Sequence, residues 1–193
     1  MAEIEVAISG KDVSGYASIF AAKAAAGRKK SDSEPPPSPV LFISSVEISA
    51  SEVLSAREHF FDRPGFNSPY LVDEDFRQWF FEKVEFAQFA CAYAFFKMIT
   101  DGVDEAIIAS LGGESLAETT LAGISFLTGQ QRTGEGGVLL TNGHANVFYV
   151  RDQFGVLRAI AASWSGLHWD LNANALDSSH PWRSARRVFT LKP

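Results

Sequence analysis

The sequence predicts an α+β fold in which N-terminal and central helices, with two short strands, precede a C-terminal antiparallel β-meander or small open barrel. Two patterns predict this class. Residues 73–98 carry apolar side chains at helical spacing, and the chain after residue 129 consists of short alternating segments separated by turn residues. We therefore expect a mainly helical α+β region over residues 1–129, with a proline-rich linker at 31–39, and an antiparallel β module over residues 130–193.

The N-terminal part is expected to begin with a strand at residues 3–9, where acidic and apolar residues alternate. An alanine-rich segment predicts a helix at residues 12–26, and Gly27 suits its C-terminal cap. Four prolines between residues 31 and 39 predict an extended linker. The β-branched and apolar run at residues 40–48 predicts a second, buried strand.

A helix is predicted over residues 50–61, after a capping signal. Ser49 lies three residues before Glu52, which is the spacing at which the two side chains satisfy each other's backbone N–H groups. A loop rich in proline, glycine and asparagine is expected at residues 63–69.

The strongest helical pattern covers residues 73–98. Three acids at its start suit the positive end of a helix dipole. Phe76 and Phe80 lie on one helical face, and Trp79 and Phe86 extend the apolar surface around most of the circumference. Because such a helix must be buried on nearly all sides, we expect it at the centre of the fold or in the seam of an oligomer.

The remaining elements are short. Two helices are predicted near residues 104–111 and 115–127, and residues 130–137 are predicted to form a loop. The strands of the β module are predicted at residues 138–141, 146–151, 156–164, 167–173 and 187–191.

The C-terminal quarter of the chain also carries a distinct sequence pattern. The residues that form it are 146–152 (NVFYVRD), 155–158 (GVLR), Trp164, Trp169, Ala173, Trp182 and 187–189 (RVF). This pattern resembles a β module of uncharacterised bacterial proteins to which no activity is assigned. The resemblance implies a bacterial-type β module and carries over no catalytic residue.

Composition and charge exclude several function classes. The chain has 193 residues, of which 46% are hydrophobic, so it can bury a sizeable core in which its 16 phenylalanines should dominate. A net charge of −6 argues against nucleic acid as the main ligand, and a single cysteine excludes an intramolecular disulfide. The most apolar stretch, residues 86–96, is about half the length of a membrane span. We therefore expect a cytoplasmic protein with no membrane or nucleic-acid partner.

Few residues predict chemistry. Cys91 lies on the apolar side of the predicted helix, where a thiol stays protonated, and no serine lies in a Gly-x-Ser-x-Gly elbow. Asp101, Asp104 and Glu105 are interpreted as solvated acids on a helix surface. The glycine cluster at residues 134–137 lacks the Lys-Ser/Thr of a phosphate loop, and no cofactor is predicted.

A metal site is one alternative. His168 and Asp170 alternate with Trp169, so on a strand their side chains project from the same face, and His144 precedes a neighbouring strand. Two histidines and one carboxylate can hold a divalent ion with open positions for water. A polar, solvated strand face is the other interpretation of this pattern.

The aromatic content of the β module suggests binding. Trp164, Trp169 and Trp182 lie near polar residues such as Asn172. Indoles stack on sugar faces while amides bind hydroxyl groups, so a glycan site is one interpretation. The other is that the three indoles form the core of a small module.

Basic residues add a further option, because Arg183, Arg186 and Arg187 follow Trp182 closely enough to bind an acidic partner or a phosphate group. We therefore expect a non-catalytic interaction or structural protein that binds a protein partner through its β module, or that self-associates. The alternatives are a metal-assisted hydrolase at His144, His168 and Asp170, and a glycan-binding module.

Overall fold

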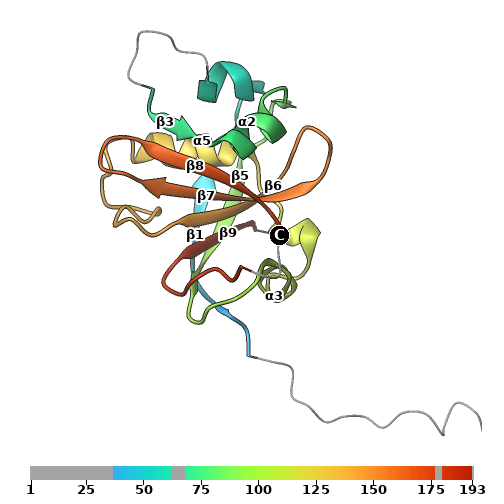
Figure 1. Ribbon diagram of the computed structural model, residues 1–193, viewed down its shortest axis with the longest axis vertical. Coiled ribbons are helices and arrows are strands. Elements are labelled where there is room, and N and C mark those ends of the chain that lie inside the picture. The colour runs from blue at the N-terminus through green and yellow to red at the C-terminus, as the bar shows by residue number, and fades with distance from the viewer. Residues whose placement is uncertain (1–36, 62–67, 177–179, 193) are drawn as a thin grey trace, which may run out of the picture. The chain divides into compact units, whose positions relative to one another are not determined.

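The computed structural model describes residues 37–61, 68–176 and 180–192, all of which belong to one unit, Pro37–Pro193 (Figure 1). The strand predicted at residues 3–9 and the helix predicted at 12–26 lie outside the described residues. So do residues 31–36 of the predicted linker and residues 63–67 of the predicted loop.

A seven-stranded mixed sheet forms the centre of the fold, in the order β1-β5-β9-β6-β7-β8-β3 (Figure 1). The pairs β6/β9 and β3/β8 are parallel and the other neighbours are antiparallel. A separate two-stranded ribbon joins β2 to β4. The strands are β1 (Val40–Ile48), β2 (Leu54–Ser55), β3 (Tyr70–Val72), β4 (Val84–Glu85), β5 (Cys91–Met98), β6 (Asn146–Arg151), β7 (Leu157–Trp164), β8 (Trp169–Ala175) and β9 (Arg187–Leu191).

Helices cover both faces of the sheet. They are α2 (Glu74–Phe80), α3 (Asp104–Ser110), α4 (Glu114–Ala117) and α5 (Leu121–Gln130), with a π-helical turn η1 (Arg57–Phe61). On β6, Phe148 packs in the cluster that contains α5, α2 and η1, whereas Tyr149 packs in the cluster that contains α3 and α4. Neighbouring residues of a strand point to opposite faces, so the central strands are buried on both sides.

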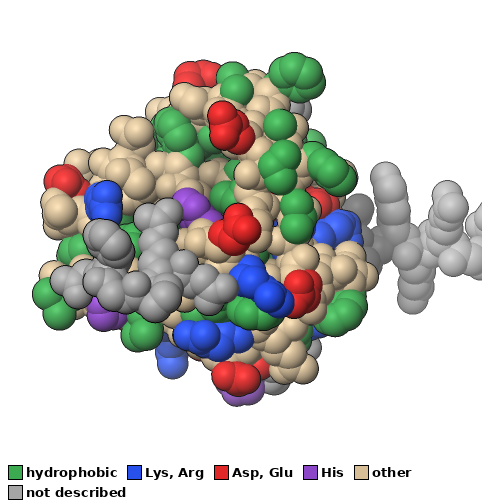
Figure 2. Space-filling model, turned by 90° about the horizontal axis from the view of Figure 1, so that it is seen from above, with side chains coloured by type: hydrophobic (Ala, Val, Ile, Leu, Met, Phe, Trp, Pro, Cys, Tyr) green, Lys and Arg blue, Asp and Glu red, His purple; other side chains and the backbone are tan. Residues whose placement is uncertain are grey.

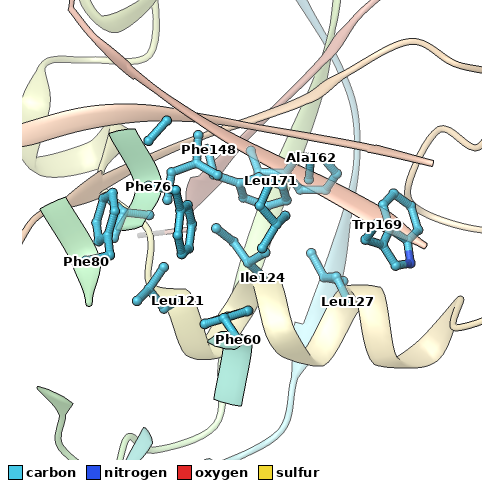
Figure 3. Packing of buried hydrophobic residues seen from close by; sticks show 14 of the residues in the cluster. Phe60, Phe76, Phe80, Leu121, Ile124, Leu127, Phe148, Ala162, Trp169 and Leu171 are labelled. Carbon is cyan, nitrogen blue, oxygen red and sulfur yellow. The ribbon is translucent and has the colours of Figure 1, made fainter. Parts of the chain in front are cut away.

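Helix α5 is the main cover of one face. Figure 3 shows Ile124 and Leu127 pointing from α5 toward the sheet. The helix also begins in the interior: Glu85 accepts hydrogen bonds from the N–H groups of Leu121 and Ala122, both at 2.9 Å. The side chain of Thr120 accepts a third, from the N–H of Gly123. The N–H of Thr120 itself donates to the Tyr93 hydroxyl at 3.1 Å, so all four N–H groups that a helix leaves unpaired are satisfied by side chains.

The prediction of one long central helix over residues 73–98 is wrong. Asp73 caps a helix, α2, by accepting a hydrogen bond from the N–H of Phe76 at 2.7 Å, but this helix ends at Phe80, and β4 and β5 follow. On β5, Tyr93 and Phe95 face the α5 side of the sheet and Met98 faces the other. A strand covered on both faces is apolar at every position, and its sequence is therefore hard to distinguish from that of a buried helix.

Other predictions are confirmed or corrected element by element. The strands at 40–48, 146–151 and 187–191 are confirmed, as is the helix near 104–111. The predicted burial of the strand at 40–48 is wrong, because β1 lies at the edge of the sheet and most of its side chains are exposed. The helix predicted at 50–61 is instead β2 followed by η1. The helix predicted at 115–127 is divided between α4 and α5, and residues 138–141 form no strand.

The α+β class is confirmed, but the C-terminal meander or barrel is not. Strands β6, β7 and β8 lie side by side in the order in which they follow along the chain, as in a meander. Strand β9 instead lies between β5 and β6 and pairs with both. Strands on both sides of the boundary predicted at residue 129 therefore share one open sheet.

Within the described part of the chain, no helix is both long and apolar enough to cross a membrane. Figure 2 shows hydrophobic side chains gathered along the upper right border of one face of the molecule.

Candidate functional site

A cleft of about 530 Å³ lies between α2, the end of β8 and residues 180–186. Its volume is within the roughly 300–1,000 Å³ that is usual for ligand-binding pockets. We call it the Trp182 cleft. Two indoles line it together with acidic, basic and amide groups: Asp75, Trp79, Asp104, Asn174, Ala175, His180, Pro181, Trp182 and Arg186.

A buried carboxylate anchors the wall of the cleft. Asp104 is only 4% exposed, and its Oδ1 accepts hydrogen bonds from the Tyr149 hydroxyl at 2.9 Å and from the Trp182 indole N–H at 2.6 Å. The Trp182 backbone also pairs with Gly102 in both directions. The Trp182 ring is thus fixed by its side chain and its backbone before any ligand binds, which lowers the entropic cost of binding.

Tyr149 keeps its proton in this arrangement. Burial raises the pKa of its phenol well above the usual value, and the nearby negative charge of Asp104 raises it further. The hydroxyl therefore remains a donor to the Asp104 carboxylate throughout the physiological pH range.

A guanidinium group lies beside each indole. The guanidinium carbon of Arg158 is 4.0 Å from the ring centroid of Trp79, and that of Arg186 is 5.0 Å from the ring centroid of Trp182. Both distances fit a cation–π interaction. Burial lowers the pKa of Arg186 below its usual value. Even so, an arginine remains charged at neutral pH.

Asp152 holds Arg158 in place. Its carboxylate lies 2.9 Å from Nε of Arg158 and also accepts hydrogen bonds from the N–H groups of Val156 and Phe154. Burial alone would raise the pKa of Asp152, but these hydrogen bonds and the positive charge of Arg158 together lower it. The carboxylate therefore stays ionised and fixes the guanidinium that packs on Trp79.

The rim of the cleft is polar and accessible. Asp75, Asn174 and His180 are exposed there and offer both hydrogen-bond donors and acceptors. Among the described residues that line the cleft there is no serine, threonine, cysteine or lysine. The arrangement is thus suited to binding a ligand with both apolar faces and polar groups.

The structure separates the three tryptophans that the sequence places together. Trp182 lines the cleft, whereas Trp169 is fully buried and donates its indole N–H to the Gln131 carbonyl at 3.1 Å. Trp164 packs beside Trp169 with ring centroids 5.6 Å apart. Trp169 is therefore part of the core, as one of the two interpretations expects, whereas Trp182 is accessible in the cleft.

Of the other residues predicted to bind a ligand, some line the cleft and some do not. Arg186 lines the cleft, while Arg183 is directed to Asp101 at 3.1 Å. Asn172 is exposed on β8, two residues before Asn174, and does not line the cleft. Of the residues predicted for binding, Trp182 and Arg186 are thus brought together.

The predicted metal ligands meet only as a pair. Nε2 of His168 lies 3.0 Å from Oδ1 of Asp170, although this oxygen has no hydrogen bond of good geometry in the described structure. His144 is exposed in the loop before β6. Within the described ranges, no three His, Cys, Asp or Glu side chains come close enough together to hold a metal ion.

Sequence reasoning missed the residues that complete the cleft. Asp104 was expected to be a solvated surface acid, but it is buried because Tyr149 and Trp182 reach it from elements far along the chain. Trp79 was expected in the central helix and instead lies on α2, next to the end of β8. These proximities arise from strand pairing, which no local sequence signal predicts.

No known family model, curated protein or solved structure matches this chain. The resemblance of the C-terminal quarter to bacterial β modules stays a prediction.

Proposed function

We propose that the protein is a binding protein and that the Trp182 cleft binds a polyhydroxylated ligand, a mono- or oligosaccharide. The observation that carries this proposal is the presence of two indoles, Trp79 and Trp182, in one cleft with carboxylate and amide groups. An indole face packs against the C–H groups of a sugar ring, and carboxylates and amides bind its hydroxyl groups.

The charges of the cleft favour a neutral ligand. Asp75 and Asp104 contribute negative charge, and Arg186 contributes positive charge. A strongly anionic ligand would have to approach the two carboxylates, which is unfavourable at short range. A neutral sugar can donate to the carboxylates and accept from the guanidinium at the same time.

Replacing Asn174 with alanine is expected to weaken sugar binding roughly two- to tenfold, because one hydrogen bond to the ligand is lost. The affinity is measured by titration calorimetry with a sugar identified on a panel of immobilised glycans. The matched control is Asn172→Ala, which removes the same side chain from the same strand, outside the cleft. Equal loss of affinity in both variants, or no binding of the wild-type chain to any glycan, would contradict the proposal.

Self-association is a second candidate function, favoured by an exposed apolar patch on the β2–β4 ribbon. We call it the Phe86 patch and define it by Val53, Val84, Phe86 and Phe89. The pairing of Leu54 with Glu85 places Val53 opposite Phe86 on the outer face of the ribbon. Phe86 and Phe89 are 82% and 95% exposed. Such a surface is characteristic of a protein–protein interface.

We expect the wild-type chain to form a dimer through this patch and the variant with Phe86→Ser and Phe89→Ser to be a monomer. Burial of these two side chains contributes roughly 3–6 kcal/mol per copy to the association. Light scattering coupled to size-exclusion chromatography at micromolar concentration gives the mass. The control is Leu167→Ser, which removes an equally exposed apolar residue from the β7–β8 turn. A monomeric wild type, or a dimer that survives both patch substitutions, would exclude this function.

A further inference from the structure

A serine and a histidine from distant parts of the chain form a hydrogen-bonded pair on the α5 side of the sheet. Oγ of Ser125, on α5, lies 2.7 Å from Nε2 of His59, on η1. Both side chains are half-buried. A hydroxyl within hydrogen-bond distance of an imidazole nitrogen is the arrangement that activates a serine nucleophile.

The pair opens into a pocket that is separate from the Trp182 cleft. The pocket has a volume of about 400 Å³ and lies between residues 49–59 and α5. Apolar side chains, including Leu54 and Phe126, line it together with several serine hydroxyls. A small ligand with an apolar group and a polar carbonyl fits this lining.

The imidazole is held in position by aromatic rings. The ring centroid of His59 is 4.7 Å from that of Phe60, in an edge-to-face arrangement, and 5.7 Å from that of Tyr70. The Tyr70 hydroxyl in turn bonds to Oγ1 of Thr128 on α5 at 2.9 Å. These contacts fix the ring so that Nε2 points at Ser125, which is the orientation that proton transfer requires.

A second hydroxyl in the same pocket lacks a partner. Oγ of Ser51 is buried and makes no hydrogen bond in the described structure, and Ser51 lines the pocket with Ser125. Buried hydroxyls are normally paired, so an unpaired one at a pocket calls for an explanation. A hydroxyl left free in this way can donate to negative charge that develops on a bound carbonyl oxygen.

We propose that Ser125 is a nucleophile, that His59 is its general base, and that the pocket accepts small carboxylic esters. Ser125 Oγ attacks the carbonyl carbon while its proton passes to Nε2 of a neutral His59. The ester C–O bond then breaks, the imidazolium returns the proton to the departing alkoxide, and the acyl group stays on Ser125. Water cleaves the acyl-serine by the same proton path and releases the carboxylic acid. Ser51 donates a hydrogen bond to the oxyanion in both steps.

The test uses the full chain with p-nitrophenyl acetate and, separately, with an alkyl fluorophosphonate. We expect a burst of nitrophenol equivalent to a single acetyl group per chain, and a fluorophosphonate adduct that peptide mapping by mass spectrometry places on Ser125. Ser125→Ala abolishes both signals. His59→Gln lowers the labelling rate at least about a hundredfold, which is the usual contribution of a general base.

The matched control is Ser110→Ala, which removes an exposed helical hydroxyl on α3, outside this pocket, and is expected to label at the wild-type rate. Circular dichroism and melting temperature confirm that each variant folds. Peptide mapping of the wild-type chain needs no variant, so the result remains decisive if a substitution prevents folding. Absence of an adduct, an adduct on another residue, or an unchanged labelling rate in His59→Gln would overturn the proposal. The hydrogen bond between Ser125 and His59 would then only stabilise the packing of η1 against α5. This inference is independent of ligand binding in the Trp182 cleft.

Discussion

Replacing Phe148 with alanine is expected to lower the free energy of unfolding by about 3–5 kcal/mol. Phe148 is fully buried on β6, near the middle of the sheet, and its ring stacks on that of Phe189 with centroids 4.6 Å apart. Phe189 stacks in turn on Phe95, so the three rings connect β6, β9 and β5 beneath α5. The smaller side chain leaves a cavity that these aromatic neighbours, packed on three strands, can fill only in part.

Urea denaturation followed by circular dichroism measures this loss. A domain of this size is stable by roughly 5–15 kcal/mol, so the variant should unfold at a much lower urea concentration. The control is Phe154→Ala in the β6–β7 turn, where the side chain is largely exposed and the expected change is within about 0.5 kcal/mol. A loss below about 1 kcal/mol for Phe148→Ala would show that α5 does not cover this face of the sheet.

Replacing Glu85 with alanine is expected to destabilise the fold by roughly 2–6 kcal/mol. Its carboxylate is the acceptor for the N–H groups of Leu121 and Ala122, and each buried donor left unpaired costs about 1–3 kcal/mol. Lys83, whose Nζ lies 3.6 Å from Oε1, also loses its partner. The effect is large because the start of α5 is buried, so water cannot replace the carboxylate.

Chemical denaturation of Glu85→Ala and Glu85→Gln tests the role of the second oxygen. Glutamine keeps one acceptor but turns an amide NH₂ toward a backbone N–H, so it should recover only part of the stability. The control is Glu52→Gln on the exposed segment before β2, where little change is expected. Full stability in Glu85→Gln would mean that a single acceptor is enough to cap α5.

Several strands of the sheet were predicted from the sequence, whereas β5 was not. Strands β1 and β9 were predicted from runs of β-branched and apolar residues, and β6 from the same pattern bounded by a turn at Asp152. β5 was mistaken for helix because the sheet is covered on both faces, which removes the alternation that marks a half-exposed strand. Local pattern alone therefore identifies where a buried segment lies, but not whether it is a helix or a strand.

The candidate cleft was predicted only in part, for a different reason. Trp182 and Arg186 are close together in the sequence, and their aromatic and basic character was visible there. Asp104 and Trp79 reach the same cleft only after β6, β8 and β9 have paired into the sheet. A single sequence holds no record of such long-range proximity.

The position of β9 has a consequence for how the molecule is assembled. Among the described strands β9 comes last in sequence, yet it lies between β5 and β6 and joins the pair β1–β5 to the group β6–β7–β8–β3. During synthesis on the ribosome, these two parts have no common edge until residues 187–191 emerge. The apolar strand edges of β5 and β6 stay open until then, so the sheet cannot be completed before residues 187–191 have emerged. Until β9 pairs with them, these open edges are sites at which the nascent chain can aggregate.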